Sequence, residues 1–227
     1  QPVSASAIAA KGHVSLLRPE RPFAVPRALT LEEIPGVLEE YRQGARNAQD
    51  TGFNGVEING ANGYLQNQFL KDNDNQRADG YGGSIANRAR LMLEVADAVT
   101  SVWGASRVGM HLAPRGDSNS MGDSDPAALF GHVARELGRR KLAFLCVREY
   151  IGPGRLGLEL KAAFGGVYIA NERFTFESAR QALAAGEADA VAFGRLFLAN
   201  PDLPRRMQLC ATFNEQEMSG FYAGGAK

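Results

Sequence analysis

Asn59, Asn62 and Tyr64 form a short group of polar side chains directly after an apolar run. Amide NH₂ groups can donate hydrogen bonds to an oxygen that gains negative charge, and a phenol can release a proton as a general acid. Asn residues are equally common in turns, where the side chain bonds to the backbone of its own loop. The spacing alone therefore leaves a catalytic role and a turn-forming role open.

A second group follows a later apolar run, where Gly194 and Arg195 come directly after Phe193. Backbone N–H groups near a glycine and a bidentate arginine suit a phosphate dianion. Ala170 and Asn171 occupy the corresponding place after the preceding apolar run. An arginine in such a loop can instead form a surface ion pair, so this site is also open at this stage.

Short apolar runs alternate with segments of helical periodicity, and these elements must position the two groups. The predicted strands are 53–58, 108–112, 143–147, 166–170 and 188–193, and the predicted helices are 34–48, 85–102, 126–140, 158–164 and 176–185. This alternation indicates a parallel sheet. No G-x-G-x-x-G motif follows the first strand, so a (β/α) barrel is favoured over a dinucleotide-binding sheet. In such barrels the active site forms at the carboxyl ends of the strands, which would bring both groups together.

Composition excludes several classes of function. Lys and Arg number 25, Asp and Glu number 25, and the formal net charge is zero. A nucleic-acid-binding surface or a polybasic membrane patch needs a basic excess, so neither partner is expected. No stretch approaches the roughly 18 apolar residues of a membrane span. Cys146 and Cys210 fit two reduced thiols of a cytoplasmic protein better than a disulfide framework or a zinc site, and no metal is expected.

The ends of the chain carry less pattern. Residues 1–29 contain four prolines and no periodicity, which predicts an extended loop, and Thr30 with Glu33 has the form of a capping box before the first helix. Residues 203–227 are expected to form a C-terminal tail. The whole chain, 1–227, is expected to form a single domain.

Several long strings resemble the Old Yellow Enzyme family of flavin-dependent ene-reductases. They lie at 55–65, 68–70, 79–90, 192–195 and 199–203, and weaker similarity continues at 214–215 and 221–222. The resemblance covers essentially the whole chain. It implies a (β/α)8 TIM barrel that binds FMN without a covalent bond, takes a hydride from NADPH or NADH, and delivers it to an activated alkene such as an enone, maleimide or nitroalkene.

The same resemblance assigns roles to the candidate residues. Asn59 and Asn62 match the pair that holds the substrate's carbonyl or nitro oxygen, and Tyr64 matches the proton donor. Gly194 and Arg195 match the phosphate grip, and Ala170 and Asn171 match the loop after strand seven.

The sequence departs from the family pattern in two ways. His111 stands where members commonly carry an arginine that faces the flavin, and Arg115, four residues later, is an alternative source of that charge. In addition, the five predicted strands match strands four to eight of the barrel, and strands one to three are absent before Gln1.

Two other functions remain open. The chain could be an inactive half-barrel that binds phosphate or needs a complementary chain, and it could be a barrel lyase or isomerase that works without flavin. No lysine or pair of carboxylates stands at a strand end, which disfavours the latter. The sequence does not distinguish NADPH from NADH, a monomer from a homodimer, or one alkene from another.

Overall fold

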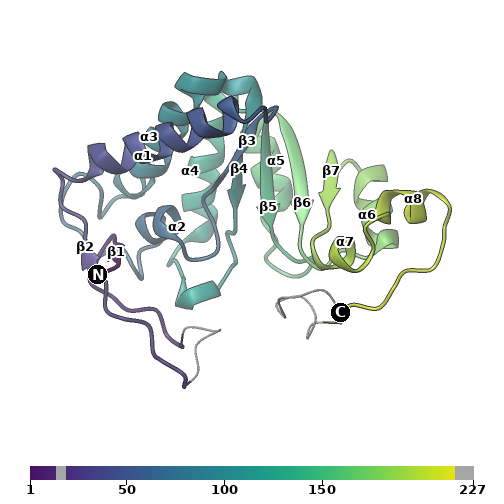
Figure 1. Ribbon diagram of the computed structural model, residues 1–227, viewed down its shortest axis with the longest axis horizontal. Coiled ribbons are helices and arrows are strands. Elements are labelled where there is room, and N and C mark those ends of the chain that lie inside the picture. Colours follow the sequence, from purple (N-terminus) through teal and green to yellow (C-terminus); the bar gives the residue numbers. More distant parts are fainter. Residues whose placement is uncertain (14–18, 218–227) are drawn as a thin grey trace.

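The structure is a computed structural model and describes residues 1–13 and 19–217. Its centre is a parallel sheet with the order β3-β4-β5-β6-β7 (Figure 1). The strands are β3 (Val56–Asn59), β4 (Val108–Leu112), β5 (Phe144–Arg148), β6 (Val167–Asn171) and β7 (Ala190–Ala192). Each strand pairs with the next one along the chain, which confirms the predicted alternation of strands and helices.

The predicted helices are all present and cover one face of this sheet. They are α1 (Ile34–Asp50), α3 (Ile85–Trp103), α4 (Pro126–Arg139), α5 (Gly157–Phe164) and α6 (Phe176–Ala184). Consecutive helices pack side by side from α1 through α3 and α4 to α5. The core lies between them and the sheet, and includes Met110, Leu145, Leu91, Leu129 and Val133.

The opposite face of the sheet carries polar side chains at its carboxyl end. Alternation along a strand sends successive side chains to opposite faces, so Met110 and Leu112 enter the core while His111 does not. The register pairs Asn59 with His111 and His111 with Cys146. Arg148, two residues beyond Cys146 on β5, therefore emerges on the same face as His111.

Three short α-helices were not predicted: α2 (Leu65–Leu70), α7 (Arg195–Ala199) and α8 (Leu203–Gln208). Each is too short for a clear 3.6-residue pattern. The predicted tail 203–227 contains α8, in which Leu203 is buried, and its residues 218–227 lie outside the described part. Figure 1 shows α6, α7 and α8 gathered beside β7, at the end of the sheet far from α1.

The predicted extended loop at 1–29 is wrong for four residues. β1 (Val3–Ser4) pairs in parallel with β2 (Arg27–Ala28), forming a small separate sheet. Two-residue strands are too short to leave a periodic pattern in the sequence. The Thr30 N–H donates to Glu33 Oε2 at 2.9 Å, but α1 begins at Ile34 with Glu33 as its N-cap and has no side-chain capping bond, so the predicted capping box does not cap this helix. Within the described residues, no helix combines the length and the apolar character needed to cross a membrane.

Candidate active site

A cavity of about 570 Å³ opens at the carboxyl ends of the strands, a size within the roughly 300–1,000 Å³ range of small-molecule sites. It is formed by the last residues of β5, β6 and β7 and by the segments that follow β6 and β7, with contributions from β4 and the loop after β3. The lining residues are Asn62, His111, Arg148, Asn171, Glu172, Arg173, Phe174, Ala192, Phe193, Gly194, Arg195, Leu196 and Gln216. Five predicted site residues therefore meet here: Asn62, His111, Asn171, Gly194 and Arg195.

The end of the cavity near β7 is suited to an anion. Gly194 immediately precedes α7, and Arg195, whose side chain is exposed, is the first residue of this helix. Within residues 1–13 and 19–217, Arg195 forms no ion pair, so the alternative of a surface ion pair has no support. Asn171 uses its Nδ2 group to donate to the Ala192 carbonyl at 2.9 Å, which holds the ends of β6 and β7 together beside Gly194.

His111 lines the same cavity and has an unpartnered polar atom. Its Nε2 atom is buried and has no hydrogen-bond partner among the described residues. Burial, reinforced by the nearby positive charge of Arg148, lowers the pKa of His111, so the imidazole is neutral at pH 7. A buried polar atom without a partner is costly, and a bound ligand that completes its hydrogen bond would remove that cost.

Arg148 is a functional candidate that the sequence analysis missed. Its Nη1 atom donates to Asn62 Oδ1 at 2.7 Å and to Ser118 Oγ at 3.3 Å, and its Nη2 atom donates to Glu172 Oε1 at 3.1 Å. Three separate loops thus converge on one guanidinium. The predicted strand ended at residue 147, whereas β5 continues through Arg148.

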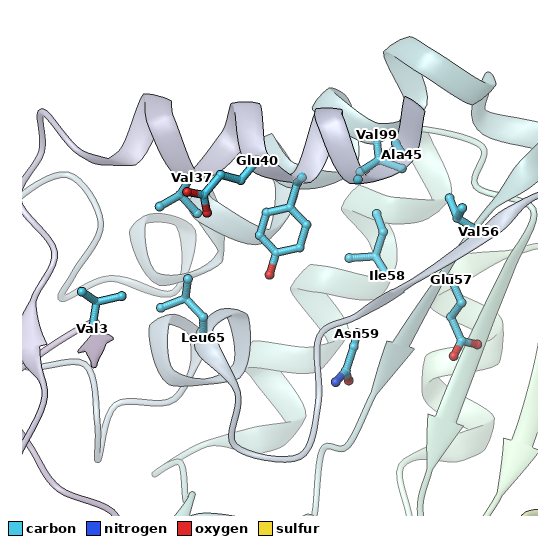
Figure 2. Close-up of a pocket in the computed structure, with 12 residues that line it drawn as sticks. Val3, Val37, Glu40, Ala45, Val56, Glu57, Ile58, Asn59, Leu65 and Val99 are labelled. Carbon is cyan, nitrogen blue, oxygen red and sulfur yellow. The ribbon is translucent and has the colours of Figure 1, made fainter. Parts of the chain in front are cut away.

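Asn59 lies in a different cavity from Asn62. That cavity, of about 470 Å³, is lined mainly by apolar residues of α1, β3 and α2, and Figure 2 shows Val37, Ile58 and Leu65 around it. Asn59 Oδ1 accepts a hydrogen bond from the Ala61 N–H at 3.1 Å, so the turn-forming role considered for this residue is real. The same bond leaves the NH₂ group of Asn59 as a donor.

Tyr64 and Ala170 line neither cavity. The Tyr64 side chain precedes α2 and is 60% exposed, and its hydroxyl makes no hydrogen bond within the described part of the chain. Ala170 is almost fully buried, because it points to the opposite face of β6 from Asn171. If Ala170 contributes to a phosphate site, it does so through its backbone.

Arg115 is turned away from the cavity. Its Nη1 atom donates to the Pro153 carbonyl at 2.6 Å, its Nε atom lies 3.6 Å from Glu149 Oε1, and its guanidinium lies 4.1 Å from the centre of the Tyr150 ring. The structure thus replaces the predicted approach of Arg115 to the site with a role in holding the loop after β5. The arginine that reaches His111 is Arg148 instead.

Cys146 lies two residues before Arg148 on β5, on the same face of the sheet. Burial, together with the neighbouring carboxyl group of Glu57, raises the pKa of its thiol to about 12. The thiol is therefore neutral and unsuited to nucleophilic chemistry at pH 7. Cys146 and Cys210 are both free, and no group of metal-binding residues occurs among the residues that the structure covers.

Comparison with known proteins decides the family. Residues 2–211 match the model of the NADH:flavin oxidoreductase / NADH oxidase family. The chain belongs to this family. The match confirms the resemblance to Old Yellow Enzymes that the sequence motifs indicated.

Relatives and solved structures agree with this assignment. The chain is 43% identical over 211 residues to 12-oxophytodienoate reductase 2 of Arabidopsis thaliana, covering 89% of this chain and 56% of that protein. The structure of the old yellow enzyme homologue from Zymomonas mobilis superposes with a TM-score of 0.95 at 38% identity. Morphinone reductase in complex with tetrahydroNAD superposes with a TM-score of 0.93 at 44% identity.

The chain spans only part of these family members. Each superposition includes 99% of this chain, but only 66% of the Zymomonas mobilis homologue and 64% of morphinone reductase. These neighbours are TIM barrels, so the five-stranded sheet is part of a (β/α)8 barrel, as predicted. Its two outer strands, β3 and β7, each pair with a single neighbour among the described residues.

The donors in the cavity fit the flavin that the family name implies. FMN carries a phosphate dianion at one end and a ring with several hydrogen-bonding atoms at the other. Gly194 and Arg195 match the former, and the unpartnered His111 Nε2 atom matches the latter. The cavity therefore offers each end of the cofactor a suitable group.

Proposed function

We propose that this chain is part of an FMN-dependent ene-reductase that reduces electron-poor alkenes such as enones, maleimides and nitroalkenes with NADPH or NADH. Family membership supports a flavin and a nicotinamide reductant. The observation that carries the proposal is one cavity that holds the anion-binding pair Gly194 and Arg195 together with the polar groups of Asn62 and His111.

In this proposal the chain first holds the cofactor. Arg195 provides a bidentate partner for the phosphate, and the backbone around Gly194 adds N–H donors. Neutral His111 offers a hydrogen bond to the ring, without adding a charge at pH 7. When bound, FMN supplies the hydride that NAD(P)H provides.

The register pairs Asn59 with His111, so the Asn59 side chain leaves β3 on the same face of the sheet as His111, although it also borders the apolar cavity beside α1. In this proposal Asn59 and Asn62 then hold the substrate's oxygen. Each amide oxygen already accepts a hydrogen bond, from the Ala61 N–H and from Arg148 respectively, so each NH₂ group is left to donate. Donation to a carbonyl or nitro oxygen draws electrons from the alkene and stabilises the charge that develops there. Because amides do not titrate, this contribution is independent of pH near neutrality.

Tyr64 supplies the proton in this proposal. Its exposed hydroxyl has no partner to displace within the described residues, and it lies two residues after Asn62. A phenol near the substrate can donate to the alkene carbon that does not receive the hydride. The net reaction adds a hydride and a proton across the double bond.

The direct test is reconstitution of the 227-residue protein with FMN. We expect the absorption spectrum of bound flavin. Under anaerobic conditions, we also expect oxidation of NAD(P)H that depends on an added enone, maleimide or nitroalkene. A half-barrel without catalytic function, the alternative suggested by the two outer strands, would retain phosphate or a complementary chain and oxidise no NAD(P)H. Failure to bind FMN under any condition would count against this chain being active by itself.

A further inference from the structure

We propose that Arg148 is a positioning residue, which fixes the Asn62 amide so that its NH₂ group is presented as a hydrogen-bond donor. The inference rests on the proposed function, because it assigns a purpose to the orientation of Asn62. It concerns a residue of β5 that neither the sequence motifs nor the predicted site included.

The chemistry of the two groups determines the orientation. A guanidinium has only donors, whereas a carboxamide has one accepting oxygen and one donating nitrogen. Arg148 Nη1 lies 2.7 Å from the Asn62 side chain, and it can only face the oxygen. The NH₂ group must therefore point along the other branch of the amide, and no hydrogen bond within residues 1–13 and 19–217 uses it.

Arg148 is itself held firmly. Glu172, from the loop after β6, accepts from its Nη2 atom and offsets its charge, and Ser118 accepts from Nη1. Both members of this ion pair are partly buried, with side-chain exposures of 32% and 20%. A bond of this kind between partly desolvated groups is stronger and better oriented than one between exposed side chains.

The backbone of Asn62 is held as well. It has a φ of 62°, in the left-handed region that Asn tolerates better than most residues, and its carbonyl accepts from Asn119 Nδ2 at 3.1 Å. With the backbone fixed, rotation of the side chain is the remaining freedom, and Arg148 removes it. Ligand binding then avoids the cost of immobilising that side chain, roughly 0.5–1.5 kcal/mol.

The test is a double-mutant cycle on the FMN-loaded protein, with Arg148→Met, Asn62→Ala and the combination. The first readout is the dissociation constant of an enone, measured from the change in flavin absorbance, and the second is the division of steady-state effects between KM and kcat. We expect Arg148→Met to weaken enone binding by roughly 2- to 12-fold, which is the cost above converted to a ratio. In the Asn62→Ala background, the same change should have little further effect, because the side chain through which Arg148 acts is gone.

Three comparisons keep the result interpretable. Arg148→Lys retains a hydrogen-bond donor and the positive charge, so its affinity for the enone should fall less than that of Arg148→Met. If the methionine variant does not fold, the lysine variant takes its place in the cycle. Arg107→Met removes an arginine that bonds to the Asn54 carbonyl before β3, and it should leave enone affinity unchanged. NAD(P)H-driven flavin reduction should persist in the Arg148 variants, because it does not require the substrate's oxygen.

The possible failures are distinguishable. If the effects of Arg148→Met and Asn62→Ala multiply, Arg148 acts independently of Asn62, and this inference is overturned while the proposed function stands. If the unaltered FMN-loaded protein binds no enone and reduces none, the proposed function fails, and this inference fails with it.

Discussion

Arg88 and Asp123 form an ion pair with side-chain exposures of only 6% and 0%. The guanidinium also donates to the Leu70 carbonyl, and the carboxylate also accepts from the Asp72 N–H at 3.0 Å. The pair therefore joins α3 to the loop after β4 and to the chain that follows α2. The loop after β4 also contains Ser118, which accepts a hydrogen bond from Arg148. The buried ion pair therefore helps to hold this loop beside the site.

Removing one partner of this pair should destabilise the protein strongly. We expect Arg88→Met to reduce the free energy of unfolding by about 3–5 kcal/mol, because the Asp123 carboxylate would remain buried without its cation. Urea denaturation of the FMN-loaded protein measures the change. As a control, Arg139→Met removes a pair with Glu136 in which the arginine is 72% exposed, and it should cost less than about 1 kcal/mol. Similar losses in both variants would show that burial does not set the value of these pairs.

Tyr64→Phe should separate the two half-reactions. We expect alkene reduction to slow by about 10²- to 10⁴-fold, the usual contribution of a positioned acid, while reduction of the flavin by NAD(P)H changes little. Stopped-flow measurement of each half-reaction gives the two rates independently. Tyr81→Phe, which alters a phenol that donates to Glu94 of α3 at 2.8 Å and lines neither cavity, is the matched control and should leave both rates unchanged. Equal slowing of both half-reactions in Tyr64→Phe would make Tyr64 a structural residue.

Arg195→Ala should weaken FMN retention. The phosphate would lose a bidentate partner, and charge-assisted hydrogen bonds are worth about 1.5–3 kcal/mol, so the dissociation constant should rise by roughly 10- to 150-fold. Quenching of flavin fluorescence measures the constant. Arg205→Ala changes an exposed arginine that bonds to Gln208 in α8, and it should leave the constant unaltered. An unchanged constant in Arg195→Ala would remove this residue from the phosphate site.

The order of elements could be predicted because each strand is short, apolar and separated from the next by a periodic helix. Every predicted strand and long helix is present, with boundaries that move by a few residues. One such shift mattered. The predicted strand ended at residue 147, and extending β5 by one residue brings Arg148 onto the cavity side of the sheet.

The site was harder to predict, because side-chain direction beyond a strand end depends on contacts between loops. Arg115 could have reached the cavity on spacing alone, yet Pro153, Glu149 and Tyr150 draw it away. Glu172 lies next to the predicted Asn171, but its use becomes visible only once β5 and β6 are paired and Arg148 is opposite. The chain separation of 24 residues between Arg148 and Glu172 gave no indication of that pairing.

The stability of the protein should depend on pH through Asp74. This residue, in the turn after α2, is 9% exposed, and burial raises the pKa of its carboxyl group from 3.8 to about 6, although the nearby charge of Lys71 opposes the shift. Because the pKa is higher in the folded state, the stabilisation from the neutral acid is complete below about pH 4 and is lost as the pH rises through 6.

Asp74→Asn, which stays neutral, should therefore match the wild type at pH 4 and unfold at a higher temperature than the wild type at pH 7. Circular dichroism melting between pH 4 and pH 8 measures this difference, with Asp50→Asn, an exposed carboxylate at the end of α1, as a control that follows the wild type. A difference between Asp74→Asn and wild type that stays constant across this range would show that Asp74 is ionised equally in both states.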